Sequence, residues 1–282
     1  MQSAAEHWTR ALGRASMRSH PFALVIERLR AFVRAIDDDP NLRRSGGEDR
    51  GPAIACIVGT LSLVFMEYVS ERDVMRWVYR LEPSLYQARF AQLAELTVWI
   101  AVRIIAFAVL PALAIRGLLR ERVVDHGLRV GGLRGHWKAY LLLYALVLPG
   151  IFIAASRPEF GRYYPFYQRA GESFCDLLTW EQLYALHFVA LEFFFRGFWL
   201  TACRRSFGSR AVYIALAPYC MIHFTKPLVE VLAAIPAAIV LGLLAMRARS
   251  IWGGALLHVA VAWTMDGLAL WNTHSFPSRW LP

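Results

Sequence analysis

The chain is poor in charged residues for its length. Asp, Glu, Lys and Arg make up only 18% of its 282 residues, and hydrophobic residues make up 57%. A soluble domain has about 25% charged and about 45–50% apolar residues. The apolar residues are grouped in blocks of about 20, the length that crosses roughly 30 Å of hydrocarbon. The composition therefore argues against an ordinary soluble enzyme and predicts an all-α, polytopic transmembrane bundle.

Cysteine is also scarce, and three sequence signals are missing. The four cysteines show no CxxC or other metal-type spacing, so we predict neither a disulfide framework nor a zinc–thiolate site. The first 50 or so residues are polar, and we find no cleavable signal peptide in them. No nucleic-acid recognition motif accompanies the net charge of +10. We therefore expect membrane lipid, and no nucleic acid, as a partner.

The hydropathy pattern divides the chain into two parts. Residues 1–51 form a soluble N-terminal segment, in which 21–36 has the spacing of an amphipathic helix. This helix is expected either to lie on a membrane surface or to cover the bundle. Residues 52–282 form the bundle, with a range of six to eight spans. We predict seven, at about 52–70, 92–115, 137–155, 180–202, 211–225, 227–246 and 251–271.

Basic residues gather in three short loops between these spans. The loops are 116–138, 203–210 and 247–249, and seven spans place all three on the side of the N-terminus. Cytoplasmic loops of membrane proteins carry an excess of Lys and Arg. The pattern predicts an integral protein of the bacterial inner membrane, or an equivalent one, with a cytoplasmic N-terminus.

Ionisable residues inside the later spans are the strongest functional signal. Placing a charge at mid-bilayer costs at least about 2.5–3.5 kcal/mol, so such residues are normally paired and normally functional. Glu192 and Arg196 are four residues apart and share a helix face, so they can form an ion pair. His187 lies off that face, and we expect it to be a satisfied core histidine.

A second group lies where one span ends and the next begins. Tyr219 and His223 precede Lys226, and Pro227 favours the first turn of a new helix. Glu230 would then lie in that first turn, where the helix dipole favours a carboxylate. Polar side chains at a helix junction at membrane depth predict a polar cavity, with an ordinary interfacial loop as the alternative.

A third group lies in the last span. His258 and Asp266 are eight residues apart, which places their side chains about 80° apart around the helix. Both can face the bundle interior. The preceding Gly253 and Gly254 would let a neighbouring helix approach closely.

Carboxylate and imidazole groups in one pocket are suited to hydrolysis. A glutamate can act as a general base on water, and histidines can stabilise an oxyanion or bind a metal. Two histidines with a carboxylate is a known catalytic zinc set, so His223 and His258 are candidate metal ligands. A metal-free mechanism is the alternative. No serine or cysteine lies beside a histidine in a nucleophile motif.

Three segments carry a family resemblance. LEFFFR at 191–196, YCMIH at 219–223 and HVAVAWTMD at 258–266 resemble, in order and separation, motifs of the CAAX-processing and bacteriocin-processing (CPBP) intramembrane proteases. Those motifs read Glu-Glu-x-x-x-Arg, Phe-x-x-x-His and His-x-x-x-Asn or Asp. The resemblance covers about residues 175–272, which we take as the protease-like core.

Three positions depart from the family pattern. Leu191 stands in place of the first glutamate, Tyr219 in place of phenylalanine, and the acidic residue after His258 comes late, as Asp266. The first glutamate is the family's proposed water-activating base, so another carboxylate would have to take its role.

The resemblance implies an intramembrane endopeptidase that acts on a lipidated or transmembrane protein. The water-activating base would be Glu192 or Glu230, and Arg196 would hold Glu192 ionised. His223 and His258 would bind zinc or stabilise the oxyanion, and Asp266 would orient one of them. Two alternatives remain: a non-catalytic binding or scaffold protein on the same fold, and a proton-coupled transporter. The transporter predicts inverted repeats, which we do not find.

Overall fold

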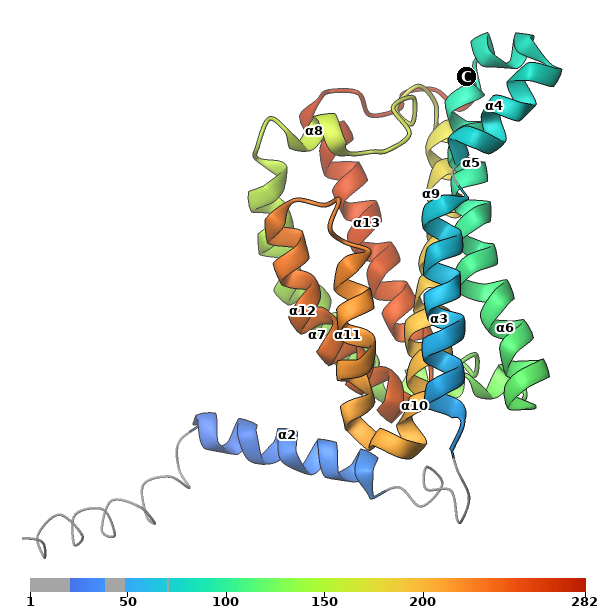
Figure 1. Cartoon of the computed structure of the whole chain (residues 1–282). Helices are drawn as coiled ribbons and strands as arrows, with labels where there is room; N and C mark the ends of the chain where they lie inside the picture. The colour runs from blue at the N-terminus through green and yellow to red at the C-terminus, as the bar shows by residue number, and fades with distance from the viewer. Residues whose placement is uncertain (1–20, 39–48, 70) are drawn as a thin grey trace, which may run out of the picture.

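A computed structural model describes residues 21–38, 49–69 and 71–282, and these residues form helices and connecting segments without a strand. The helices are α2 (Pro21–Asp37), α3 (Gly51–Tyr68), α4 (Glu71–Leu81), α5 (Ala91–Ile104), α6 (Leu110–Ala114), α7 (Gly131–Ala155), α8 (Phe160–Tyr163), α9 (Phe174–Glu192), α10 (Leu200–Phe207), α11 (Ala211–Met221), α12 (Leu228–Ala248) and α13 (Trp252–Asn272). The predicted all-α bundle is confirmed (Figure 1).

Six helical runs of the described residues are long and apolar enough to cross a membrane. This number lies within the predicted range and is one fewer than the seven spans that we placed. The difference lies in the run Phe174–Met221, which contains the fourth predicted span and most of the fifth. A 3₁₀ turn at Gly208–Arg210, where Gly208 has a φ of +56°, reverses the chain between α10 and α11 (Figure 1). The run is therefore a helical hairpin with a long and a short arm.

The central element of the bundle is the run that contains α9, α10 and α11. In its most apolar window 72% of the residues are buried, against 17% to 39% in the other five runs. Its middle is a π-helical segment, Phe193–Trp199, whose seven residues are all buried. The aromatic side chains of this segment belong to the largest core cluster. They pack there with Phe107, which lies between α5 and α6. Because π-helical turns occur frequently at functional sites, this fully buried segment is a candidate place for one.

The three basic loops meet at one end of the bundle. Gly127 accepts a backbone hydrogen bond of 2.9 Å from Ile251, which joins the first loop to the third. Arg205 forms a 2.6 Å ion pair with Glu121, which joins the second loop to the first. Helix α2 lies across the same end, and the C-terminus lies at the other (Figure 1). The charge arrangement is the one expected of positive-inside topology, and the cytoplasmic location of this end stays a prediction.

Helix α2 is tied to the hairpin by its last residue. The Asp37 carboxylate accepts hydrogen bonds from the backbone N–H of Ser209 at 2.7 Å and from the Ser209 hydroxyl at 3.1 Å. Ile36 is buried in the largest core cluster, and Phe32 packs against it. The C-terminal half of the predicted amphipathic helix therefore covers the end of the bundle.

Candidate active site

The three motif segments come together inside the bundle. Glu192 at the end of α9, Arg196 in the π-helical segment, Tyr219 on α11 and His258 on α13 form one group, which we call the inner cluster. The Glu192 Oε1 atom lies 3.1 Å from Arg196 Nη1 and 3.2 Å from His258 Nδ1. The Tyr219 hydroxyl lies 3.2 Å from His258 Nε2. Sequence spacing predicted the Glu192–Arg196 pair, and the fold adds the histidine and the tyrosine.

The surroundings of His258 fix which of its nitrogens carries the proton. Nδ1 lies 3.1 Å from the carbonyl oxygen of Gly254 and 3.2 Å from the Glu192 carboxylate, and both are acceptors. Nδ1 is therefore the protonated nitrogen of the neutral ring, and Nε2 accepts from the Tyr219 hydroxyl. The ring also stacks on Phe188, with centroids 5.4 Å apart and planes 13° apart. The protein thus holds His258 in one orientation and one tautomer.

Glu192 is a buried carboxylate that keeps one oxygen, Oε2, without a donor partner among the described residues. Its side chain is 0% exposed and that of Arg196 is 2% exposed. Among the residues that the structure describes, no hydrogen bond of good geometry reaches either Glu192 oxygen or either terminal nitrogen of Arg196, although Oε1 keeps its ion-pair contacts. The two charges balance each other, but a buried polar group without a partner costs about 1–3 kcal/mol. Such orphaned atoms in a folded interior call for water or a ligand.

Gly254 sets how closely α13 approaches this carboxylate. A Cβ atom built at Gly254 would collide with the Glu192 carboxyl group, and one at Gly253 would collide with the Tyr140 ring of α7. The two glycines thus allow the close approach expected from the sequence. In addition, Gly254 provides the carbonyl that orients His258.

His223 lies at the edge of the inner cluster. Its Nδ1 atom lies 2.8 Å from the carbonyl oxygen of Tyr219, and its ring packs on the Tyr219 ring at 4.8 Å. Burial lowers the pKa of His223 below its ordinary value of 6.5, so the ring is neutral near pH 7 with its proton on Nδ1. The contacts of the described residues do not join His223 to His258 or to Glu192.

The donors present do not fit the predicted zinc site. Among the residues that the structure describes, no group of three or more His, Cys, Asp or Glu side chains is placed to hold a metal ion. Both ring nitrogens of His258 already have protein partners. Zinc binding by His223 and His258 stays a prediction, and no step below depends on it.

Glu230 belongs to a different group, which we call the outer cluster: Tyr164, Phe166, Lys226 and Glu230. The Tyr164 hydroxyl lies 3.2 and 3.3 Å from the two Glu230 oxygens and accepts from Lys226 Nζ at 3.3 Å. The Lys226 ammonium lies 4.3 Å from the centre of the Phe166 ring. Burial lowers the pKa of Lys226 and, with the Glu230 charge, raises the pKa of Tyr164.

Asp266 is also separate from the inner cluster. It is 0% exposed, and its Oδ2 atom accepts a 2.7 Å hydrogen bond from the indole of Trp180 on α9. Its expected hydrogen bond to a histidine is not among the contacts of the described residues. The cause is the angular offset along α13: His258 faces the inner cluster, and Asp266 faces Trp180.

Three functional candidates were absent from the sequence prediction of the site. Tyr219 was noted only as a departure from phenylalanine, yet that departure supplies the hydroxyl that holds His258. Trp180 carries no signal of its own in the sequence, and Gly254 was predicted only as a point of close helix approach. His187 is in the core, as expected, but it is not satisfied, because its Nδ1 atom has no partner.

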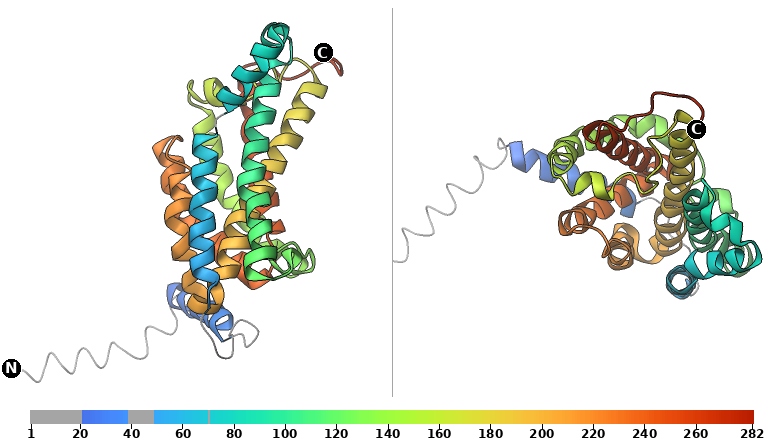
Figure 2. Two further views of the ribbon diagram at one scale, coloured as in Figure 1. Left: turned by 45° about the vertical axis from the view of Figure 1, so that its right-hand side comes forward. Right: turned by 90° about the horizontal axis from the view of Figure 1, so that it is seen from above.

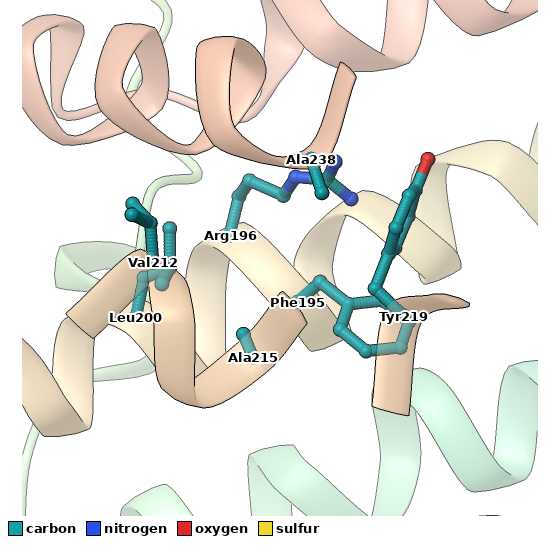
Figure 3. Close-up of a pocket in the computed structure, with 7 residues that line it drawn as sticks. All are labelled: Phe195, Arg196, Leu200, Val212, Ala215, Tyr219 and Ala238. Atoms are coloured by element: carbon teal, nitrogen blue, oxygen red, sulfur yellow. The ribbon is translucent and has the colours of Figure 1, made fainter. Parts of the chain in front are cut away.

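A small cavity lies beside the inner cluster. Its volume of about 10 Å³ is close to that of a single water site. Its lining comes from the π-helical segment, α10, α11 and α12: Phe195, Arg196, Leu200, Val212, Ala215, Tyr219 and Ala238. Figure 3 shows the Arg196 side chain extending toward the Tyr219 ring, 4.3 Å from the ring centre. The cavity is too small for a peptide, and its lining is apolar apart from Arg196 and Tyr219.

Comparison with known proteins gives one finding. Residues 176–264, about a third of the chain, match the family described as type II CAAX prenyl endopeptidase Rce1-like. The match includes every predicted site residue except Asp266. No curated protein and no solved structure matches the chain. The predicted resemblance is therefore confirmed: over residues 176–264 this integral membrane protein is similar to the Rce1-like type II CAAX prenyl endopeptidases of the CPBP family.

Proposed function

We propose that the chain is an intramembrane endopeptidase that uses Glu192 to activate water. The observation that supports this most is the state of the Glu192 carboxylate. It is fully buried and lies beside a guanidinium, and its Oε2 atom has no donor partner among the described residues. A carboxylate in that state can bind a water molecule and take its proton.

The remaining inner-cluster residues have roles that follow from their contacts. Arg196 keeps Glu192 ionised, and its unpaired N–H groups can stabilise the oxyanion that forms when water attacks the peptide carbonyl. His258 and Tyr219 position the carboxylate. Glu192 then returns the proton to the leaving amine as the C–N bond breaks. The Nδ1 protons of both histidines already point to acceptors, so Arg196 is the better oxyanion donor.

The substrate that we propose is a membrane-associated, lipidated protein. The family match supports this class, and burial of the site within the spans requires a substrate that reaches membrane depth. His258, with 19% of its side chain exposed, is the part of the Glu192–Arg196–His258 group nearest the surface. A substrate chain would therefore approach from the His258 side and displace the helices that cover Glu192.

A non-catalytic binding protein is the second candidate. Leu191, in place of the family's first glutamate, is only 5% exposed and lies in the largest apolar core cluster. Leu191 supplies no carboxylate, so the inner cluster has Glu192 as its one carboxylate among the described residues. Against this candidate, the buried charges of the inner cluster are expensive to keep in a decayed site.

Cleavage in proteoliposomes distinguishes these functions. The reporter is a fluorescent peptide with a prenylated cysteine near its C-terminus, and the proteins are the wild type and Glu192→Gln. We expect the wild type to release the terminal fragment, with or without a zinc chelator, and the variant to release none. Reporter binding without cleavage by the wild type would establish the non-catalytic alternative. Equal cleavage by both proteins would overturn the role of Glu192.

A further inference from the structure

One apolar stripe runs the whole length of α2. Val25, Leu29, Phe32 and Ile36 lie within about 60° of one another around the helix axis, at 100° per residue. Arg30 lies on the opposite side. The stripe is therefore one continuous face.

The two halves of this face have different surroundings. At the C-terminal half, Ile36 is 2% exposed, and Phe32 packs against core clusters that include residues of α7 and α12. At the N-terminal half, Leu29 is 54% exposed and Val25 is 61% exposed. Figure 1 and the view from above in Figure 2 show that the N-terminal end of α2 extends past the outline of the bundle.

The position of α2 determines what lies against its free half. The helix crosses the end of the bundle where α3, α7 and α13 begin and α12 ends (Figure 1). Because these helices are candidate membrane spans, we place the boundary between hydrocarbon and headgroups near this level. Because the stripe faces the bundle at Phe32 and Ile36, the same face beyond the rim is directed toward the bilayer.

The charges of α2 suit the same location. Between residues 24 and 36 the helix carries three arginines, Arg28, Arg30 and Arg34, and one acidic residue, Glu27. The basic loops lie at the same end of the molecule. A basic polar face opposite an apolar face is the pattern of helices that lie in the membrane interface and are attracted to anionic lipids.

We infer that the N-terminal half of α2 is inserted in the bilayer interface beside the bundle, with Val25 and Leu29 among the acyl chains and the arginines at the headgroups. The helix is then a membrane-surface arm tied to the protein core at Ile36 and at the Asp37–Ser209 contact. This inference is independent of the proposed protease activity.

Spin labels on the full-length protein in nanodiscs test it. A keto amino acid carries the label, so the native cysteines stay unchanged, and the label is placed at Leu29 or at the matched position Arg30. We expect oxygen to relax the label at 29 more than a water-soluble nickel chelate does, with the reverse at 30. We also expect greater depth at 29 when the bilayer contains phosphatidylglycerol.

Labels can disturb a helix, so the unlabelled protein provides a second measurement. Hydrogen exchange of residues 24–30 should be at least several-fold slower in nanodiscs than in a neutral detergent with a short polar headgroup, while residues 33–36 change less. Equal aqueous accessibility at 29 and 30, with no slowing of exchange at 24–30, would overturn the inference.

Discussion

The inner and outer clusters contain similar groups but use them differently. Each has one glutamate, one cation and one tyrosine hydroxyl. Both Glu230 oxygens lie within hydrogen-bonding distance of the Tyr164 hydroxyl. Among the described residues, Glu192 Oε1 contacts Arg196 and His258, whereas Glu192 Oε2 has no donor partner. The comparison shows that a costly residue type in a span is not enough to identify a catalytic group. The two clusters differ in whether the carboxylate keeps an oxygen without a donor.

The outer cluster holds two connecting segments together. Lys226 and Glu230 lie on either side of Pro227. Both contact Tyr164, which lies in the connection between α7 and α9. The Tyr163 hydroxyl adds a 3.3 Å hydrogen bond to the carbonyl oxygen of Thr225. We interpret the outer cluster as a structural contact that holds the turn after His223 in place. We interpret the inner cluster as the site of the reaction.

The largest effect is expected from removing the inner cation. Arg196→Met leaves the Glu192 carboxylate buried without a counter-charge, which should cost about 3–5 kcal/mol of stability. Thermal unfolding in detergent measures the loss. The double variant Glu192→Gln with Arg196→Met should recover most of it. A double variant as unstable as Arg196→Met alone would show that the guanidinium acts by packing rather than by charge.

The second largest effect is expected from a change in the geometry of the inner cluster. In Gly254→Ala the new methyl group meets the Glu192 carboxyl group, so we expect reporter cleavage to fall about 100-fold, since such displacement of a catalytic group by about 1 Å costs that much. Gly267→Ala on the same helix is the matched control, because a Cβ there meets no atom within 4 Å. Equal activity in the two variants would remove Gly254 from the site.

A smaller effect, on stability rather than on kcat, is expected when the hydrogen bond to Asp266 is removed. Trp180→Phe removes the hydrogen-bond donor of a buried carboxylate, which should cost about 1–3 kcal/mol of stability. The kcat of the folded fraction should change little. A large fall in kcat at unchanged stability would instead give Asp266 the role near the site that the sequence predicted.

The smallest effect concerns the tyrosine of the second motif. Tyr219→Phe restores the family's phenylalanine and deletes the hydroxyl that lies 3.2 Å from His258 Nε2. One hydrogen bond is worth about 0.5–1.5 kcal/mol, so we expect about a tenfold fall in kcat at most. The stacking of His258 on Phe188 should keep the ring in place. Loss of all activity would mean that the hydroxyl itself takes part in the reaction.

Local patterns in the sequence were enough to predict the spans and one ion pair. Blocks of about 20 apolar residues define helices in lipid, and a four-residue spacing places Arg196 beside Glu192. Contacts between distant segments could not be predicted in this way. Trp180 meets Asp266 across 86 residues, and Tyr164 meets Glu230 across 66. Such pairs depend on how the helices pack, which the spacing along one helix does not specify.

The central claim is that Glu192, and not Glu230, is the carboxylate of the reaction. The most direct test compares two identical substitutions, Glu192→Gln and Glu230→Gln, by their initial rates of reporter cleavage in proteoliposomes, after thermal unfolding has shown both to be folded. We expect Glu192→Gln to lower the rate at least about 10³-fold, as removal of a general base does, and Glu230→Gln to lower it less than about tenfold. A folded Glu192→Gln variant that keeps its activity, beside a Glu230→Gln variant that loses it, would contradict the account.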